Sequence, residues 1–415
     1  MAKVSRLSKC RMCGNEHLVE VVDLGYQYMT GVFPKDKASR GLTQGPLRLV
    51  KCHGVDACGL LQLDHSYDLG EMYGDNYGYR SGLNRQMVAH LHAKITRVQA
   101  MAKLAAGDLV IDIGANDGTS LGAYREDLLL VGVDPTGAKF RQYYKKHVQL
   151  IPDFFSAKLV ADAFPGRKAK VITSFSMLYD LDQPLTFARD IAEILDKTDG
   201  IWVFEQSYMP LMLDRLAFDT ICHEHLEYYG LKQIMWMLEQ VGLKVVDVEL
   251  NDVNGGSFSV VAASRESGRT VEKGKIAALL QDERARGLDG LHPYEHFDRQ
   301  IKQICGELTR FVRKAKAEGK RVGALGASTK GNVLLQYCGF TDQDIEVVGE
   351  VNPDKFGVYT PGTGIPIEDE KAVLARRYDY LIVLPWHFKE FFLQNKAFTG
   401  QHLLFPLPRI EVITP

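Results

Sequence analysis

The feature that most constrains the fold is an alternation of helical and strand-like patterns between residues 85 and 265. Apolar strand candidates recur through this region, and segments with helical periodicity separate them. The candidates are 109–114, 129–134, 148–151, 171–175 and 200–205. Parallel strands need crossover connections, which are usually helices, so this alternation favours a parallel sheet with helices on both faces. The sequence therefore predicts an α/β fold.

A shorter alternation of the same kind follows a charged helical segment at about 269–319. At the other end of the chain, residues 1–70 show little helical periodicity and hold four of the seven cysteines. We therefore expect a small N-terminal module at 1–70, a central domain at 71–265 and a C-terminal α/β domain at 266–415.

The overall charge disfavours some partners. The chain has 50 Lys and Arg residues against 52 Asp and Glu residues, a net charge of −2. It therefore lacks the broad positive field that nucleic acid or an anionic membrane attracts. No apolar run reaches the roughly 18 residues of a membrane span, and the first residues lack a signal-peptide core. We expect a cytoplasmic monomer that binds neither nucleic acid nor membrane.

Two pairs of cysteines lie near the N-terminus, Cys10 with Cys13 and Cys52 with Cys58. Thiolates bind Zn²⁺ tetrahedrally, and two such pairs supply four ligands. The second pair is widely spaced, so His53 is an alternative ligand, and unconnected buried cysteines are the other interpretation. We favour a structural zinc ion, because four protein ligands leave no open position for catalysis.

The strand candidate at 109–114 leads into a glycine loop, Gly114-Ala-Asn-Asp-Gly118. Glycine lets a ligand approach the backbone, and a following helix N-terminus offers free N–H groups. The loop lacks one glycine of the dinucleotide fingerprint and the lysine of a phosphate loop. Asp134, some 20 residues further on, is placed to bind ribose hydroxyls. The alternative is a purely structural turn.

Two more carboxylates, Asp112 and Asp117, flank this loop. Their charge would repel a pyrophosphate but suits a sulfonium cation. The combination resembles class I S-adenosylmethionine-dependent methyltransferases, which implies a Rossmann-like central domain. The same resemblance implies that Asp153 and Phe154, after the third strand, lie near the adenine.

A further cluster, Cys222-His-Glu-His225, follows the strand candidate at 200–205. A histidine beside a carboxylate can act as a general base whose charged form is supported electrostatically. Its two histidines could instead bind a metal, although no third ligand is obvious nearby. Taken alone, such a pair is more often structural.

Together, these features resemble one family, the sugar C-methyltransferases that add a branch methyl at C-3′ of nucleotide-linked 4-keto-6-deoxyhexoses in antibiotic and lipopolysaccharide pathways. The resemblance covers nearly the whole length, and the order of the domains carries it. It implies a zinc-binding module, a class I methyltransferase core and a Rossmann-like C-terminal domain. It also implies S-adenosylmethionine and structural Zn²⁺ as cofactors, with a dTDP- or GDP-linked sugar as substrate.

The resemblance assigns roles to individual residues. It implies that the zinc ligands are Cys10, Cys13, Cys52 and Cys58. It implies that the cofactor loop is formed by Asp112, Gly114, Asn116 and Asp117. It implies that a segment containing Tyr77, Tyr79 and Ser81 reaches the sugar site. It implies that Glu224 and His225 are the catalytic pair. It implies a diphosphate site with Lys330, Asn332, Asn352, Lys355 and Thr360.

Two positions depart from the family pattern. Cys222 stands where dTDP-sugar members commonly carry tyrosine, and Tyr179 stands where they have histidine. Both lie close to the expected sugar site, so we include Cys222 among its residues and leave the proton path and stereochemistry open. Trp386 and His387, after the last strand, are further candidates there, although core packing suits Trp386 equally.

Carbon methylation needs a carbanion equivalent, and a C-4′ ketone acidifies the neighbouring C-3′ hydrogen. We expect His225 to remove that proton while Glu224 holds the histidine tautomer and stabilises the imidazolium. Tyr179, Tyr77 or Tyr79 would donate a hydrogen bond to the enolate oxygen. No metal is needed in this step.

Other functions stay open at this point. An O- or N-methyltransferase would share the cofactor loop but would need no ketone. A zinc-ribbon nucleic-acid binder is disfavoured by the near-neutral charge. A catalytically inactive scaffold would keep the fold without using the Glu-His pair. Lys330 and Lys355, considered singly, are equally consistent with solvated surface residues.

Overall fold

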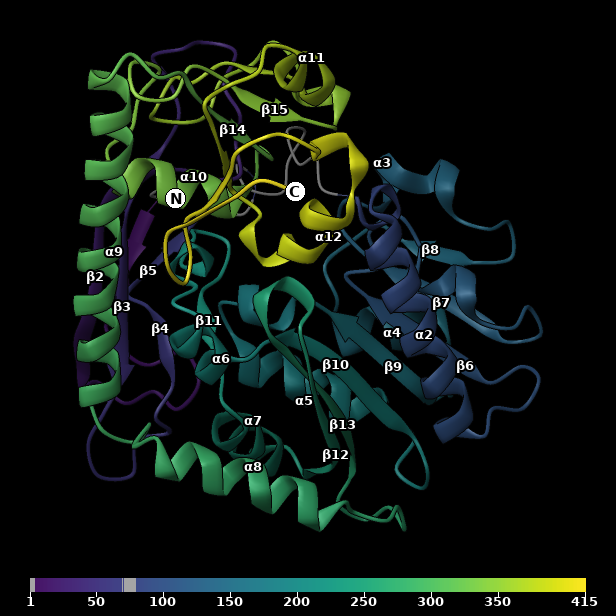
Figure 1. Cartoon of the computed structure of the whole chain (residues 1–415). Coiled ribbons are helices and arrows are strands. Elements are labelled where there is room, and N and C mark those ends of the chain that lie inside the picture. The colour runs from purple at the N-terminus through teal and green to yellow at the C-terminus, as the bar shows by residue number, and fades with distance from the viewer. Residues whose placement is uncertain (1–3, 69, 71–79) are drawn as a thin grey trace.

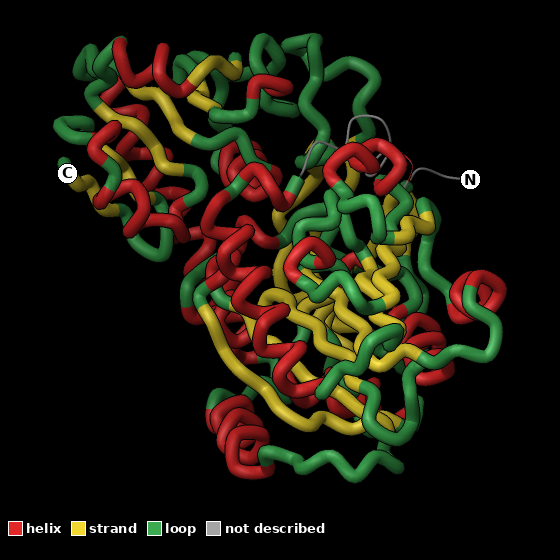
Figure 2. The backbone as a smooth tube through the Cα atoms, turned by 90° about the vertical axis from the view of Figure 1, so that its right-hand side faces the viewer, coloured by secondary structure: helices red, strands yellow, loops and turns green. Residues whose placement is uncertain are grey.

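The computed structural model describes residues 4–68, 70 and 80–415, so Tyr77 and Tyr79 lie outside the described residues. The largest sheet occupies the centre of the molecule, with an N-terminal sheet and a C-terminal sheet beside it (Figure 1). In the view of Figure 2, the C-terminal strands and helices form a lobe to one side of the central sheet. No helix among the described residues is long and apolar enough to cross a membrane.

The central sheet has seven strands in the order β12-β13-β10-β9-β6-β7-β8. The strands are β6 (Leu109–Ile113), β7 (Leu129–Val133), β8 (Gln149–Ile151), β9 (Ala169–Phe175), β10 (Ile201–Ser207), β12 (Leu243–Asn251) and β13 (Ser257–Ser264). β13 runs antiparallel to both of its neighbours, whereas the pairs from β10 to β8 are parallel. This is the strand order of class I methyltransferases, and it confirms the predicted Rossmann-like fold.

Helices cover the two faces of this sheet, as the alternation predicts. They are α2 (Arg85–Ala102), α3 (Gly137–Phe140), α4 (Ala157–Ala163), α5 (Pro184–Ile194), α6 (Met209–Asp214) and α7 (Leu231–Gln240). β6 is buried along its entire length, because helices cover both sides of it. α2 buries Leu91, Ile95 and Val98, which are spaced at three and four residues and so share one helix face.

The N-terminal module does not complete its own sheet. Its strands are β1 (Val4–Arg6), β2 (Leu18–Tyr28), β3 (Gln44–Cys52), β4 (Leu61–Leu63) and β5 (His65–Tyr67). The four-stranded sheet has the order β11-β4-β3-β2, and its edge strand β11 (Glu227–Tyr228) comes from the chain just after His225. The predicted catalytic segment is therefore anchored to the N-terminal sheet.

The C-terminal sheet has the order β16-β15-β14-β17-β18-β19, with only β19 antiparallel to its neighbour. Its strands are β14 (Val322–Leu325), β15 (Val348–Glu350), β16 (Ile367–Asp369), β17 (Tyr380–Val383), β18 (Leu403–Phe405) and β19 (Glu411–Ile413). The helices that lead into it and cover it are α8 (Lys273–Ala285), α9 (His292–Ala317), α10 (Thr329–Tyr337), α11 (Glu370–Ala375) and α12 (Lys389–Gln394).

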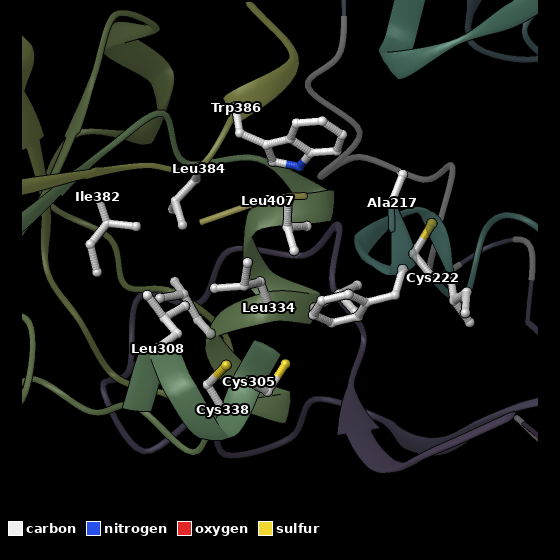
Figure 3. Packing of buried hydrophobic residues seen from close by; sticks show 14 of the residues in the cluster. Ala217, Cys222, Cys305, Leu308, Leu334, Cys338, Ile382, Leu384, Trp386 and Leu407 are labelled. Atoms are coloured by element: carbon white, nitrogen blue, oxygen red, sulfur yellow. The ribbon is translucent and has the colours of Figure 1, made fainter. Parts of the chain in front are cut away.

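One hydrophobic core joins the N-terminal and C-terminal parts. It runs from Leu49 of β3 through Leu308 of α9 to Ile382 of β17. Figure 3 shows Ala217 and Cys222, from the chain before β11, on the same core as residues of α9, α10 and β17. The segment that carries Glu224 and His225 is thus fixed between the outer sheets and the central sheet.

Candidate active site

The glycine loop follows β6 at the carboxyl edge of the central sheet. Gly114 has φ +69°, a backbone angle that favours glycine, and a Cβ there would lie 3.1 Å from the Met177 side chain. The backbone N–H of Asn116 donates to Asp134 Oδ2 at 2.7 Å. The loop and the predicted ribose-binding carboxylate are therefore in direct contact.

The segment before α2 closes over this loop. The Ser81 N–H donates to Asn116 Oδ1 at 3.0 Å, and the Gly82 N–H donates to Asp117 Oδ2 at 2.9 Å. We predicted that Ser81 reaches the sugar, and the structure places its backbone on the cofactor loop.

The remaining predicted cofactor residues surround the same edge. Asp112 accepts a hydrogen bond from Thr173 Oγ1 at 2.5 Å, and burial raises the pKa of its carboxyl to about 7. Asp153 and Phe154 follow β8 and are exposed. An edge lined with carboxylates and an exposed aromatic ring fits S-adenosylmethionine, which carries a sulfonium charge, a ribose and an adenine.

The four N-terminal cysteines form one compact cluster, with all their Sγ atoms within 4.8 Å of one another. Cys10 Sγ lies 3.6 Å from Cys58 Sγ, and Cys13 Sγ lies 3.5 Å from Cys52 Sγ. Thiolates bound to one zinc ion at ~2.3 Å would stand about 3.8 Å apart, so the set fits the ion.

Amide groups support these sulfurs. Gln62 Nε2 donates to Cys10 Sγ at 3.1 Å, and Asn15 Nδ2 donates to Cys52 Sγ at 3.3 Å. Such donors orient metal ligands and stabilise thiolate charge. His53, the alternative ligand, contributes no side-chain atom to the cluster found among the described residues.

His225 lies between a backbone carbonyl and an aromatic ring. Its Nδ1 is 2.9 Å from the Thr220 carbonyl oxygen, and its ring centroid is 4.3 Å from that of Tyr179. Burial, with the nearby charge of Lys330, lowers the pKa of His225 to about 3. The ring is therefore neutral, and because a carbonyl only accepts, Nδ1 carries the proton and Nε2 is the basic nitrogen.

This geometry corrects one prediction. We expected Glu224 to hold the His225 tautomer, but the Thr220 carbonyl does so. Glu224 instead points to the N-terminal module, where a Cβ on Gly31 would lie only 2.0 Å from its Oε1. Burial raises the pKa of Glu224 to about 7, and Cys222 Sγ lies 3.9 Å from its Oε2.

A small cavity adjoins the predicted base. Tyr179, Thr220, His225 and Glu227 contribute to its lining. Burial raises the pKa of Glu227 well above its usual value, and the Tyr229 hydroxyl donates to Glu227 Oε2 at 2.7 Å. The structure therefore brings Tyr179 and His225 to one cavity, together with the carboxyl group of Glu227, which the sequence did not single out.

The C-terminal domain brings two lysines to this region. Lys330 Nζ donates to the Asn254 carbonyl oxygen at 2.8 Å, across the interface with the central sheet. Lys355 Nζ donates to the Ala327 carbonyl oxygen at 2.7 Å and lies 4.4 Å from the centre of the Phe33 ring. Burial lowers the pKa of both lysines.

Three predicted substrate residues have structural roles instead. Asn332 is fully buried and donates to the Thr30 carbonyl oxygen at 2.7 Å, which ties α10 to the N-terminal module. Thr360 is fully buried, and its hydroxyl accepts the Ile365 N–H at 3.0 Å. Trp386 is buried and donates to Asp219 Oδ2 at 2.8 Å. These side chains are enclosed by protein, so the structure corrects their assignment to the substrate.

Of the remaining candidates, Cys222 is fully buried, whereas Asn352 and His387 are partly exposed. Asn352 caps a short helix by accepting the Asp354 N–H at 3.1 Å. His387 faces Gly255 in the turn between β12 and β13, where a Cβ would lie 3.8 Å from its side chain. Their roles toward a substrate stay predictions.

Three domain-family models match the chain in sequence. A zinc binding domain matches residues 10–73, a methyltransferase domain matches 83–248, and a C-methyltransferase C-terminal domain matches 252–408. The C-methyltransferase NovU of Streptomyces niveus is 29% identical over 422 residues, covering 99% of this chain and 98% of that protein. The chain is an S-adenosylmethionine-dependent C-methyltransferase. Its cofactors are S-adenosylmethionine and zinc.

Solved structures resemble part of this C-methyltransferase. The magnesium protoporphyrin IX methyltransferase of Synechocystis with bound S-adenosylhomocysteine is 14% identical, with a TM-score of 0.32, covering 43% of this chain and 82% of that one. An S-adenosylmethionine-dependent methyltransferase of Clostridium acetobutylicum is 13% identical, with a TM-score of 0.34, and the match covers 43% of this chain and 92% of that one.

Sequence reasoning missed two groups in this C-methyltransferase. The Thr220 carbonyl is a backbone atom, so no residue type could reveal its contact with His225. Glu227 falls two positions after His225, in the strand that joins the N-terminal sheet. His225 lies outside that two-residue strand, so no strand periodicity in the sequence links Glu227 to the base.

Proposed function

We propose that this C-methyltransferase methylates C-3′ of a 4-keto-6-deoxyhexose linked to dTDP or GDP, acting as a cytoplasmic monomer. The supporting observation is a neutral histidine beside the cofactor domain: His225 has its Nδ1 on the Thr220 carbonyl and its ring against Tyr179. Carbon methylation requires a base for a C–H bond next to a ketone, and a neutral imidazole is such a base.

In the proposed reaction, His225 Nε2 takes the C-3′ proton, and the C–H electron pair becomes the carbon–carbon double bond of an enolate. The former C-4′ carbonyl oxygen then carries the negative charge. Tyr179 donates a hydrogen bond to that oxygen, which is the kind of electrostatic support that usually contributes most. Bound S-adenosylmethionine would supply an electrophilic methyl group. The enolate carbon would bond to that methyl as the sulfur–methyl bond breaks, so that the C-4′ carbonyl re-forms and S-adenosylhomocysteine leaves. His225 would then release its proton to solvent.

The lysines of the C-terminal domain serve the nucleotide in this proposal. A diphosphate needs cations and backbone donors, and Lys330 and Lys355 are cations near the start of α10 and the turn after β15. Burial disfavours the charged form of both lysine side chains. A bound anion would stabilise that charged form and so offset the desolvation free energy.

The test is to incubate the purified protein with S-adenosylmethionine and a panel of dTDP- and GDP-linked 4-keto-6-deoxysugars. We expect the mass of one methyl group to be added, with NMR placing it on carbon C-3′. A methyl group on oxygen or nitrogen would overturn the proposal. A panel that gives no product with either nucleotide would overturn the proposed substrate class.

A further inference from the structure

Arg80 lies just before α2 and contacts the cofactor loop from outside. Its Nε is 3.6 Å from Asp117 Oδ2, and its guanidinium carbon is 4.0 Å from the centre of the Tyr143 ring. The side chain is 22% exposed, so one part of it faces solvent while the rest is held between the carboxylate and the ring. Arg80 is thus oriented without being enclosed.

Arg80 keeps N–H donors that form no hydrogen bond with Asp117. Its Oδ1 already accepts from the backbone N–H and the hydroxyl of Thr119, and its Oδ2 accepts from the Gly82 N–H. At 3.6 Å, Arg80 is paired with Asp117 by charge but not by a hydrogen bond. Its buried Nε has no hydrogen-bond partner in the described part of the chain. A guanidinium has five N–H donors, so an acceptor is missing here.

The charge around the loop indicates what that acceptor is. Asp117 and Asp134 are carboxyl groups at this edge, which suit the sulfonium and ammonium groups of S-adenosylmethionine. The same carboxyl groups repel the α-carboxylate of its methionyl part. Of the ion pairs between described residues, the one that involves this loop is that of Arg80. An arginine fork matches a carboxylate in geometry as well as in charge.

We propose that Arg80 binds the α-carboxylate of S-adenosylmethionine, with Tyr143 and Asp117 orienting its guanidinium. This inference rests on the cofactor lying at the Gly114 loop, and it does not depend on which molecule accepts the methyl group. The hydrogen bonds of the Ser81 and Gly82 N–H groups to the loop fix the backbone next to Arg80 and so help to position its side chain.

The test compares ligands that differ in the carboxylate. Calorimetry of the full-length protein would measure the affinity for S-adenosylmethionine and the affinity for its decarboxylated analogue, which lacks only the α-carboxylate. We expect the wild type to bind decarboxylated S-adenosylmethionine roughly 10- to 100-fold more weakly than the intact cofactor. Arg80→Met should bind both with the same affinity, because it lacks the group that distinguishes them.

Two kinds of control variant accompany the test. Arg85→Met alters an exposed arginine at the start of α2 and should keep the wild-type discrimination. Tyr143→Phe keeps the ring under the guanidinium, so it should keep the wild-type discrimination between the two ligands. Tyr143→Leu removes the ring and should lose part of that discrimination.

One result would overturn the proposal. If Arg80→Met keeps the wild-type ratio between the two affinities, even with both affinities weakened by the same factor, then Arg80 supports the loop and does not bind the carboxylate. No sugar is present in these measurements. Failure of the proposed sugar substrate would therefore leave the result standing, and failure here would leave the sugar proposal standing.

Discussion

The imidazole of His225 lies against the phenol ring of Tyr179, with the ring centroids 4.3 Å apart and the rings tilted by 59°. His225 comes from the segment before β11, and Tyr179 comes from the short helix Leu178–Asp180 after β9. The contact therefore joins the end of a central strand to the chain that completes the N-terminal sheet. In the proposed reaction, His225 is the base and Tyr179 is the hydroxyl donor.

Replacing His225 with glutamine should lower kcat by about 10²- to 10⁴-fold, because glutamine keeps a polar side chain but cannot accept the proton. Binding of S-adenosylhomocysteine should not change, since the cofactor loop follows β6 of the central sheet, whereas His225 precedes β11 of the N-terminal sheet. Steady-state kinetics and calorimetry measure the two effects. A variant with undiminished kcat would exclude His225 as the base.

The pH dependence of kcat/KM tests the neutral state of His225. Its pKa is lowered to about 3, so lowering the pH to 5 should leave the base unprotonated and active. We expect no loss of activity near the usual histidine pKa of about 6.5. Lys330→Met should move the acidic limb to higher pH, because the lysine charge contributes to the low pKa of His225. A fall in the kcat/KM of the wild type with a midpoint at pH 6.5 would contradict the lowered pKa of His225.

Glu224→Gln should stabilise the protein at neutral pH. Burial raises the pKa of Glu224 from 4.5 to about 7, so between these values the unfolded chain releases a proton that the folded chain retains. This contribution to folding is complete below pH 4.5 and is lost as the pH rises through 7. The difference in unfolding free energy between variant and wild type should therefore grow across that window, by about 3 kcal/mol at most.

Chemical denaturation at several pH values between 4.5 and 8 measures this difference. Glu390→Gln, which removes an exposed carboxyl group in α12, is the matched control and should show no such trend. A constant difference for Glu224→Gln across the window would refute the raised pKa.

Zinc should be present at one ion per chain, and its removal should destabilise the N-terminal sheet. Metal analysis should find no zinc in the Cys10→Ser, Cys58→Ser double variant, whereas Cys305→Ser in α9 should retain it. Chelation should lower the melting temperature, because binding free energy at such a site is also folding free energy. Activity should fall as well, since β11 joins His225 to this sheet. Retention of zinc after loss of two thiols would contradict the cluster.

Local patterns predicted much of this fold. Apolar runs separated by helical periodicity located the strands of the central sheet, because burial on both faces imposes that pattern. The glycine loop contacts Asp134 as expected, since adjacent parallel strands end at the same edge of the sheet. The cysteine cluster followed from spacing and chemistry.

Tertiary contacts account for what the sequence did not reveal. Asn332 and Thr360 stand near glycine turns that favour a diphosphate, yet packing against the N-terminal module and a local turn bury them. β11 pairs with β4 through Glu227 and Gln62, which lie 165 positions apart in the chain, and no local pattern records such a pairing. Arg80 was overlooked because a single arginine carries no motif.

Solvent exchange at the sugar carbon tests the central claim most directly. The wild-type enzyme would be incubated in D₂O with S-adenosylhomocysteine and a nucleotide-linked 4-keto-6-deoxyhexose, and the sugar analysed by NMR. Enolate formation predicts that one deuterium enters at C-3′, and that His225→Gln abolishes this exchange. Methyl transfer to C-3′ by the wild type, with no deuterium entering under any of these conditions and unchanged turnover of His225→Gln, would contradict the account.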